Sequence, residues 1–456
     1  MKGKERKMES NKKIISESGV WNVRKCGAVG DGKTSNTEII QEAINTCHLK
    51  GGGRVLIPPG VYLSGSLMLK SDVDLHLTRG ATLLGSPNIQ DYHPNLISEY
   101  VERIPAGFPK NIVAAHLLSA KNSERISITG QGTIDGNSSV FFGERRTDTR
   151  LKRFSIIDSR PWHTIAFYDC KDILVEGVHI LNATTYSISP YNCKRVRIEG
   201  LTIRNHPSTP NGDGIDIDCC KDVIIYGCCI DTADDCIAIK SGSISNPPNF
   251  SRNGMPCENI IASNCNLKSM TTGVRLGVEG DNPIINVNLN NLSIESYRGI
   301  GLDSCVIKRV DIVEGTLIEN VNISQVTINN STTPVYAVCG SNTSPKASIG
   351  RVSIHQLQAT GNGASIFYGK ATKPIDYLSI RDVHLRIKGH FDRTPYPEGD
   401  IPDNLDYAKG GAKERVPYAL YGRYLKNLRL DGITVDMKDA TGPWAGNCRF
   451  DDTEKI

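Results

Sequence analysis

Three aspartates in two short acidic segments have the residue type and the spacing that cleavage of a sugar linkage requires. The segments read Asn-Gly-Asp-Gly-Ile-Asp at 211–216 and Ala-Asp-Asp-Cys-Ile-Ala-Ile-Lys at 233–240. Asp234 and Asp235 are adjacent, and Asp213 lies 22 positions before Asp235. If the chain winds in coils of about this length, the three carboxylates come together on one face.

Cleavage of a glycosidic bond with inversion needs one carboxylic acid that protonates the leaving oxygen and one carboxylate that deprotonates a water molecule. We predict that Asp234 is the acid and that Asp213 and Asp235 hold the water. Crowding of like charges raises at least one pKa, which keeps one carboxyl group protonated near neutral pH. The residues alone leave an alternative open, because aspartates in such sequences also cap turns or bind calcium.

These aspartates lie within a repeated unit of a polar residue, cysteine, alternating aliphatic residues and glycine. The unit occurs at 168–180, 191–203 and 218–230, and its glycines at 177, 200 and 227 are 23 and then 27 residues apart. Short strands recurring at this interval predict an all-β fold, a right-handed single-stranded parallel β-helix. A β-sandwich or a propeller is the alternative. Weaker copies of the unit lie at 259–267, 284–294, 317–328, 352–357, 378–387 and 428–435.

One segment near the start has a helical pattern. Ser35 and Glu38 form a capping box, and glycines at 51–53 end the segment. We expect this helix to cap the open N-terminal end of the coils. The predicted organisation is a single catalytic β-helix domain at 21–456, preceded by a segment at 1–20 that is disordered or added during cloning. The apolar residues at helical intervals are Ile40, Ala43, Ile44 and Cys47.

Three segments have the composition of loops. They are 144–153, which is dense in charge, 241–256, which is rich in Ser, Asn and Pro, and 389–416, which contains several Pro and Gly. Their simplest interpretation is solvated connections. The alternative is that they form the walls of a cleft, because solenoid loops tend to gather on one face.

The composition and charge of the chain limit the classes of partner that we expect it to bind. The chain has 456 residues, 39% hydrophobic and 22% charged, with a net charge of +4 and a pI near 8.3. Such a balance suits a globular domain and gives no field that attracts nucleic acid. No apolar run reaches the roughly 18 residues of a membrane helix, so no membrane partner is expected. We expect a monomer that acts on a carbohydrate.

The N-terminal residues contain no apolar segment that would form a secretory signal. We expect a periplasmic or extracellular protein whose signal is missing from this chain, with a cytoplasmic location left open. The 14 cysteines are too few for a disulfide scaffold, and most stand singly within repeats, so we expect buried, stacked thiols. No pair has zinc-site spacing, and we predict no metal and no cofactor.

At this point the chain resembles the polygalacturonase family of glycoside hydrolases, family 28, whose members cleave pectin. The family motif Asn-Thr-Asp-Gly-x-Asp is matched at 211–216, with Gly212 in place of threonine. The motif Gly-Asp-Asp-Cys-Ile-Ala-Ile-Lys-Ser-Gly is matched through residue 242, with Ala233 in place of the first glycine. The resemblance runs from about residue 22 to 440 and implies catalytic roles for Asp213, Asp234 and Asp235. Further similar segments lie at 26–32, 69–77 and 130–136.

Two departures from the family pattern indicate a divergent member. The family's Gly-His-Gly should fall near 271–277, where this chain has no histidine. The family's Arg-Ile-Lys, which binds the uronate carboxylate, should fall near 301–303, where Asp303 stands instead and would repel such a substrate. The residues that we expect to contact substrate are Asn211, Asp216, Lys240, Arg275, Arg298 and Asp303.

The sequence therefore predicts an inverting glycoside hydrolase for a pectic or related plant polysaccharide. A branched side chain, a rhamnogalacturonan-type backbone or a neutral sugar linkage is favoured over plain homogalacturonan. Two alternatives remain. One is a β-helix lyase, in which the three aspartates would hold calcium. The other is a carbohydrate-binding or adhesion solenoid that has lost catalysis together with the family's histidine and Arg-Lys pair.

Overall fold

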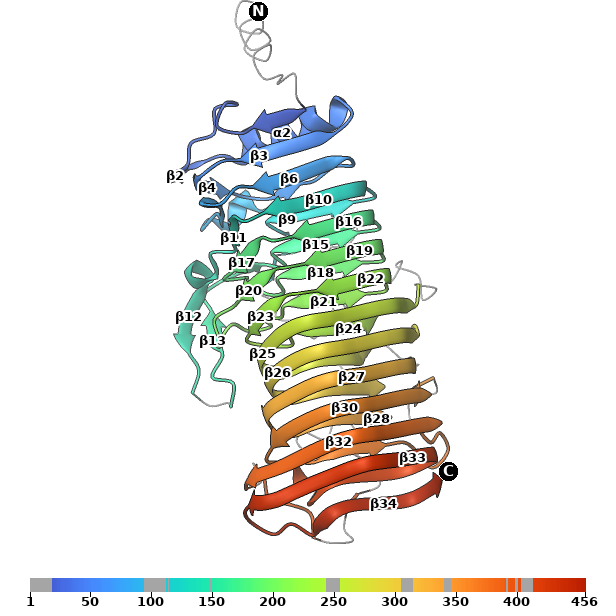
Figure 1. Ribbon diagram of the computed structural model, residues 1–456. Helices are drawn as coiled ribbons and strands as arrows, with labels where there is room; N and C mark the ends of the chain where they lie inside the picture. Colours follow the sequence, from blue (N-terminus) through green and yellow to red (C-terminus); the bar gives the residue numbers. More distant parts are fainter. Residues whose placement is uncertain are drawn as a thin grey trace, which may run out of the picture.

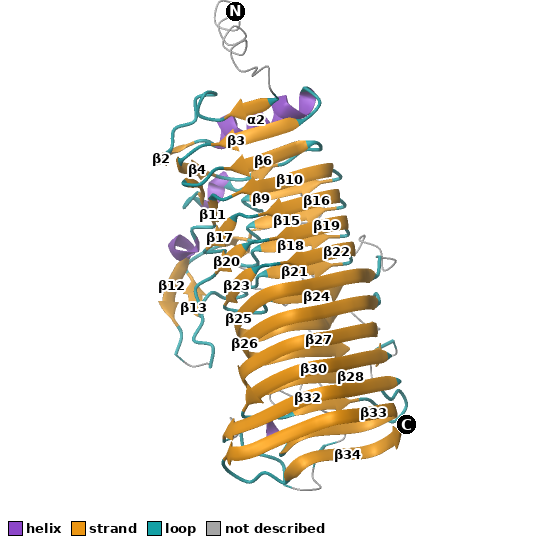
Figure 2. Cartoon of the chain, in the orientation of Figure 1, coloured by secondary structure: helices purple, strands orange, loops and turns teal. Residues whose placement is uncertain are grey.

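The computed structural model is an elongated stack of coils that runs from the N-terminal to the C-terminal end (Figure 1). Strands make up most of it (Figure 2). The segments predicted as loops at 241–256 and 389–416, and the segment at 1–20, lie largely outside the described residues. The structure describes residues 19–93, 112–113, 115–147, 150–242, 255–304, 315–339, 346–390, 393–397, 401–402 and 413–456.

Each regular coil contributes three strands, as the coil between residues 171 and 191 illustrates. β16 (Lys171–Glu176) is followed by β17 (His179–Leu181) and β18 (Ile188–Tyr191). The next coil begins with β19 (Lys194–Glu199), which pairs in parallel with β16. Every regular coil therefore adds one strand to each of three rows, and each row runs along one face of the stack. The predicted all-β fold of stacked parallel strands is confirmed.

The first row of strands shows the alternation that the repeats predict. Lys171 pairs with Lys194, and Lys194 pairs with Lys221, so successive coils are offset by the predicted 23 and 27 residues. In this row buried residues alternate with residues open to solvent. The row comprises β1 (Val20–Asn22), β3 (Gly53–Ile57), β6 (Val73–Leu77), β10 (Glu124–Gly130), β16, β19, β22 (Lys221–Tyr226), β29 (Ser348–Ile349), and parts of β25 (Cys257–Gly280), β26 (Ile284–Ser304), β27 (Leu317–Ser331), β30 (Arg351–Gly361), β32 (Tyr377–Gly389) and β33 (Tyr418–Ala440).

The second row is made of shorter strands. Gly177, Gly200 and Gly227 stand at the corner between the first two rows, with φ of 74°, 63° and 65°, a conformation that glycine adopts without strain. From β25 onward single long strands run through this corner without a break. The row comprises β2 (Asp31–Ser35), β4 (Gly60–Ser64), β7 (Ala81–Gly85), β11 (Thr133–Asp135), β17, β20 (Thr202–Arg204) and β23 (Cys229–Thr232).

The third row differs from the first because its outward-facing residues are buried as well. All the residues of β15 (Ile165–Tyr168), β18, β21 (Ile215–Asp218) and β24 (Ile237–Ser241) are buried. Isoleucines of these strands point into the core, and polar residues alternate with them. The other members are β5 (Leu67–Met68), β9 (Leu118–Lys121), parts of β25, β26 and β33, β28 (Thr333–Cys339), β31 (Ser365–Tyr368) and β34 (Gly446–Lys455).

The predicted helix forms as α2 (Thr37–Leu49), and it lies at the N-terminal end of the stack (Figure 1). Its buried residues are the four apolar ones that the pattern selected. The predicted capping box is wrong. Asn36 is the N-cap residue, and its side chain bonds to the backbone of Val29 instead of the helix, while Ser35 Oγ lies 3.4 Å from Thr37 Oγ1.

Two features lie outside the three rows. The predicted loop at 144–153 is largely a hairpin, in which β12 (Phe142–Arg145) pairs antiparallel with β13 (Phe154–Ile156) and projects from the side of the stack (Figure 1). β8 (Ile112–Val113) pairs with β14 (Arg160–Pro161). None of the helices among the described residues has the length and apolar character needed to cross a bilayer. The short 3₁₀ helices are η2 (Ile89–Asp91), η4 (Ser138–Phe141) and η6 (Lys413–Arg415).

Most of the cysteines are buried thiols, as expected. Cys170, Cys193 and Cys220 stand at corresponding positions of three successive coils, each directly before a first-row strand, and each thiol contacts backbone carbonyl groups. No disulfide joins the described cysteines. The stacked thiols therefore pack as small apolar side chains.

Candidate active site

The three predicted aspartates come together at one edge of the third row. Asp213 stands just before β21, and Asp234 and Asp235 stand just before β24. The two strands pair in parallel, with Ile215 opposite Ile237, so the coil repeat aligns the acidic segments. One carboxylate oxygen from each aspartate lies within 4.8 Å of the others.

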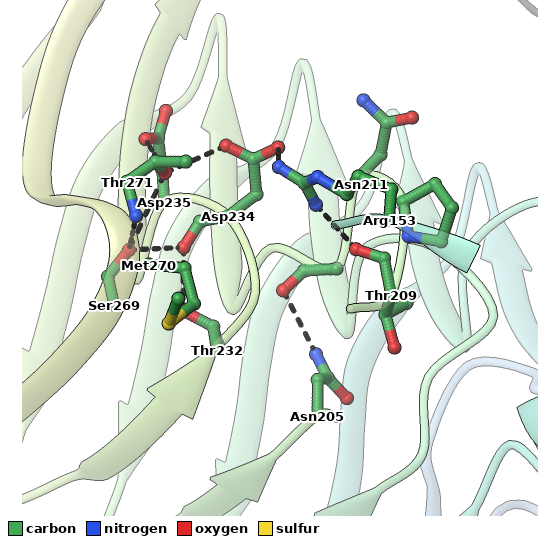
Figure 3. A network of polar contacts seen from close by, with 12 residues as sticks. Arg153, Asn205, Thr209, Asn211, Thr232, Asp234, Asp235, Ser269, Met270 and Thr271 are labelled. Atoms are coloured by element: carbon green, nitrogen blue, oxygen red, sulfur yellow. Dashed lines mark hydrogen bonds and ion pairs between the residues drawn. The ribbon is translucent and has the colours of Figure 1, made fainter. Parts of the chain in front are cut away.

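Backbone contacts between neighbouring coils fix the three aspartates. The amide of Ser187 donates to the carbonyl oxygen of Asp213 at 3.1 Å, and the amide of Gly214 donates to that of Asp235 at 2.9 Å. The hydroxyl of Ser269 donates to the carbonyl oxygen of Asp234 at 2.6 Å (Figure 3). Because each carbonyl is held from an adjacent coil, the side chains are presented on a rigid support.

The departures from the family motifs at positions 212 and 233 are explained by local packing. A Cβ atom on Gly212 would lie 2.8 Å from Cβ of Thr209 and 3.1 Å from Cβ of Ala233. The family's threonine at position 212 therefore conflicts with the alanine that this chain carries at 233. Gly214 cannot be replaced by a larger residue without a clash, because a Cβ atom at this position would lie 2.4 Å from the carbonyl oxygen of Cys236.

Thr271 joins two of the aspartates. Its hydroxyl lies 2.8 Å from Oδ1 of Asp234 and 2.9 Å from Oδ1 of Asp235 (Figure 3). A hydroxyl has one proton, so it donates to one carboxylate at a time. Both contacts are hydrogen bonds when one of the two carboxyl groups is itself protonated and donates to the threonine oxygen. The bridge thus suits a pair of acids that shares a proton.

Two arginines bind the outer oxygens of the same pair. Nη2 of Arg153 lies 2.6 Å from Oδ2 of Asp234, and Nη1 of Arg275 lies 3.2 Å from Oδ2 of Asp235. Arg153 also donates from Nη1 to the carbonyl oxygen of Thr209 at 2.5 Å (Figure 3). Arg153 directly precedes β13 of the hairpin, whereas Arg275 belongs to the third row, so separate parts of the fold bring the two cations.

Asp213 is buried and lies close to several other charged groups. Its residue is 5% exposed, and its Oδ1 atom has no hydrogen-bond partner among the described residues. Burial, followed by the charges of Asp216 and Asp234, raises the pKa of Asp213 well above its ordinary value. The raised pKa that crowding predicts therefore falls on Asp213, while Asp234 was the predicted acid.

Lys240 and Asp216 form a buried ion pair beside Asp213. Nζ of Lys240 lies 2.7 Å from Oδ1 of Asp216, and the two side chains are 9% and 1% exposed. The ammonium group also lies 4.4 Å from the centre of the Tyr186 ring, which is a cation–π contact. Both residues were predicted to contact substrate. Because both side chains are buried and pair with each other, we interpret them as residues that support Asp213 from within the protein.

Asp303 does not face a substrate as predicted. Its residue is fully buried, its Oδ2 accepts a hydrogen bond from the hydroxyl of Tyr336 at 2.7 Å, and Nε of Arg275 lies 3.4 Å away. Arg275 thus lies between the carboxylates of Asp303 and Asp235. The charge of Asp303, which was expected to repel a uronate, is offset by Arg275.

The remaining two predicted contacts lie further from the aspartates. Arg298 pairs with the buried Glu414 at 2.6 Å, and no hydrogen bond joins it to the three aspartates among the described residues. Asn211 adopts a left-handed conformation with φ of 54°, and Nη2 of Arg160 lies 3.5 Å from its Oδ1. Arg160 is fully buried and also donates to the carbonyl oxygen of Pro210 at 2.7 Å, which anchors the segment before Asp213.

Sequence reasoning missed Arg153, Thr271 and Arg160. Thr271 stands in the segment that corresponds to the family's Gly-His-Gly, and its hydroxyl was a signal because it is a polar group next to the position of the missing histidine. Arg153 closes the charge-dense segment at 144–153, and its contact with Asp234 agrees with the alternative that this segment forms a wall. Arg160 carried no signal, because a single arginine among apolar residues is usually an exposed cation.

The three carboxylates could also hold a cation such as calcium, which prefers oxygen ligands. Guanidinium groups of Arg153 and Arg275 already contact the outer oxygens of Asp234 and Asp235. These contacts compensate the negative charge and compete with an ion for the same atoms. The donor set therefore fits an acid–base pair better than a calcium site.

Comparison with known proteins agrees with the motifs. The family model of the glycosyl hydrolases family 28 matches residues 55–365. A probable polygalacturonase of Vitis vinifera is 31% identical over 224 residues, which are 47% of this chain and 43% of that protein. An exo-poly-alpha-D-galacturonosidase of Dickeya chrysanthemi is 42% identical over 119 residues, which are 26% of this chain and 19% of that protein. The chain thus spans less than half the length of these two relatives.

Solved structures share the fold. The family 28 exopolygalacturonase of Yersinia enterocolitica superposes with a TM-score of 0.68 at 21% identity, covering 95% of this chain and 78% of that one. At this identity the likeness concerns the fold, which is the parallel β-helix seen here. The matched family segment contains both acidic motifs and all three aspartates, and it covers more than half of the chain. The chain belongs to the glycosyl hydrolases family 28.

Proposed function

We propose that this protein is a glycosidase that hydrolyses a pectin-related polysaccharide or oligosaccharide. The observation that carries the proposal is the trio of carboxylates within 4.8 Å, one of which, Asp213, has a raised pKa. Proton donation and proton removal at one bond need carboxyl groups in different protonation states. Membership of the family supports the same reaction class.

In the proposed reaction Asp234 is the general acid. Its side chain is 20% exposed, against 5% for that of Asp235, so it is the more open member of the bridged pair. Its proton passes to the glycosidic oxygen as the bond from the anomeric carbon to that oxygen breaks. A water molecule held by Asp213 and Asp235 attacks the anomeric carbon, and the water's proton passes to the carboxylate of Asp235. One water is consumed for each bond that is cleaved.

Inversion stays a prediction that rests on the family resemblance. General acid and base groups of inverting enzymes are usually about 6.5–9.5 Å apart, and those of retaining enzymes about 5–5.5 Å apart. The nearest oxygens of this trio are closer than either range, so spacing does not select the outcome. Following the anomer of the first product by NMR tests it. A product that keeps the substrate's configuration would contradict inversion while leaving hydrolysis intact.

Replacement of Asp234 tests the proposed activity. We expect Asp234→Asn to lower kcat about 100- to 10,000-fold, which is the usual contribution of general acid–base catalysis. Asp172→Asn is the matched control, because Asp172 belongs to an exposed ion pair in the first row, and it should leave kcat unchanged. The measurement is reducing-sugar release from a panel of pectic oligosaccharides.

The same panel separates the alternatives. A lyase would release unsaturated products that absorb in the ultraviolet and would depend on added calcium. A binding or adhesion solenoid would bind oligosaccharides without releasing reducing ends, and Asp234→Asn would then have no hydrolysis to lose. Either result would end the proposal of a hydrolase.

The finer architectural predictions belong to the same proposal. We infer right-handed coils, because parallel crossover connections are right-handed in almost all proteins. We infer that α2 caps the first coil, since its buried face packs on β1, β3, β5 and β6. A single catalytic domain at 21–456, a monomer and a periplasmic or extracellular location complete the proposal, the last because polysaccharides are found there.

A further inference from the structure

Arg153 differs from the other cations around the site because the carboxylate with which it pairs is the proposed general acid. The carboxylates that pair with Lys240 and Arg298 lie outside the aspartate trio, and each is at most 2% exposed. Arg275 divides its contacts between Asp235 and the fully buried Asp303. The carboxylate bound by Arg153 is Asp234, the proposed general acid, and both side chains of this pair are partly exposed, at 16% and 20%.

The partnership of Arg153 and Asp234 conflicts with the proposed reaction. A guanidinium group at 2.6 Å stabilises the charged form of a carboxylate, whereas a general acid must carry a proton before it can act. When Asp234 takes up that proton, Arg153 loses its anionic partner. Its other contact is the neutral carbonyl oxygen of Thr209. A partly buried guanidinium without an anion is unfavourable, so protonation of Asp234 is favoured when another anion takes its place.

We propose that Arg153 is a specificity-determining residue that exchanges Asp234 for a carboxylate of the substrate. The substrate class is a saccharide with a uronic acid next to the bond that is cleaved. The carboxylate of this uronic acid replaces Asp234 on the guanidinium group of Arg153. Asp234 is then released, takes one proton from solvent and becomes the general acid. This inference rests on the proposed function. It places the uronate-binding cation on the hairpin, far in sequence from the position where the family's Arg-Ile-Lys is missing.

The position of the hairpin supports this assignment. The backbone amide of Phe154, next to Arg153, donates to the carbonyl oxygen of Ser208 at 2.8 Å. The Arg150 guanidinium stacks on the ring of Tyr297 at 3.7 Å and donates to the carbonyl oxygen of Met270 at 3.2 Å. The hairpin is therefore fixed to several coils at once, and Arg153 is held at the trio without depending on its bond to Asp234.

The first experiment compares two substrates. One is an oligogalacturonate, and the other is the same oligosaccharide with its carboxylates reduced to the neutral sugar. In Arg153→Gln we expect the ratio of the two kcat/KM values to fall about 10- to 100-fold, the range of a charge-assisted hydrogen bond. Arg153→Lys keeps the charge without the fork and should recover part of the ratio. Arg150→Gln is the matched control, and it should affect both substrates equally.

The second experiment measures binding alone, so it does not depend on turnover. Asp234→Asn removes the anion that competes for Arg153, and calorimetry should show about 10-fold or greater tightening for the oligogalacturonate but not for its neutral counterpart. The double variant with Arg153→Gln should lose this gain. Equal affinities in all the variants, or an unchanged ratio in Arg153→Gln, would overturn the role of Arg153. Absence of hydrolysis by the natural protein would end the proposed function and leave this binding test in force.

Discussion

The first and third rows of strands are built from the same repeat, yet they bury their residues differently. In β16, β19 and β22 of the first row, buried aliphatic residues alternate with residues that are exposed or partly exposed to solvent, most of them charged. In β15, β18, β21 and β24 of the third row, both sets are buried. The polar residues of the third row therefore need partners within the protein, which those of the first row find in water.

The two rows show what that need produces. Arg195 and Asp172 of the first row form an ion pair at 2.5 Å with side chains 54% and 38% exposed. Lys240 and Asp216 of the third row form one at 2.7 Å, almost fully buried, beside the aspartate trio. A short distance thus has different consequences on the two faces. The exposed pair lies on the surface of the solenoid, away from the aspartates. The buried pair belongs to the network of charged residues that surrounds the proposed catalytic aspartates.

Removing one partner from each pair tests this contrast directly. We expect Lys240→Met to destabilise the protein by about 3–5 kcal/mol, because it removes the cation that pairs with the buried carboxylate of Asp216. Arg195→Met should destabilise the protein far less, because water screens the exposed pair. Chemical denaturation of both variants gives the two free energies of unfolding. Similar losses would show that burial does not distinguish the two faces.

A second test concerns the packing that separates this site from the family motifs. We expect Gly212→Thr to destabilise by about 1–3 kcal/mol, because its Cβ would press on Thr209 and Ala233. Ala233→Gly removes one of these contacts and should recover part of the loss when the two changes are combined. The coupling is measured with a double-mutant cycle. Strict additivity would mean that the two departures from the motifs are independent.

The contrast between the rows also explains what the sequence could predict. Contacts between neighbouring coils follow the repeat, so the offsets of Lys171, Lys194 and Lys221 and the meeting of the acidic segments could be expected from spacing. The type and core-facing side of α2 followed from its apolar intervals. Its capping box did not, because the side chain of Asn36 satisfies the loop at Val29 instead of the helix.

Two of the contacts that were not predicted do not follow the repeat. Arg153 reaches Asp234 across 81 positions and Arg298 reaches Glu414 across 116, each by way of a segment inserted between regular coils. Periodicity carries no information about where such a segment comes to rest. The burial of Asp303 is different, because its partners Arg275 and Tyr336 belong to third-row strands of the two neighbouring coils.

The smallest expected effect concerns the buried carboxyl group of Asp213 and its contribution to stability as the pH changes. Burial, then Asp216 and Asp234, raises the pKa of Asp213 above its ordinary value of 3.8. The folded state therefore binds this proton more tightly than the unfolded state, and its free energy of unfolding falls as pH rises from 3.8 through the raised pKa. Above that window the charged group destabilises the fold to the full extent.

Asp213→Asn removes the buried charge while keeping the shape of the side chain. We expect this variant to be more stable than the natural protein by about 0.5–2 kcal/mol at neutral pH, although it loses activity. The advantage should shrink as the pH falls toward 3.8, because Asp213 is then protonated in both states. Asp172→Asn in the first row provides the comparison, since its carboxylate is exposed and its pKa is lowered by Arg195. Across this pH range Asp172→Asn should therefore be less stable than the natural protein by a nearly constant amount, because the pH dependence of Asp172 lies below 3.8. Thermal unfolding of the two variants measures both differences. A gain for Asp213→Asn that did not change with pH would mean that it does not come from the charge of Asp213.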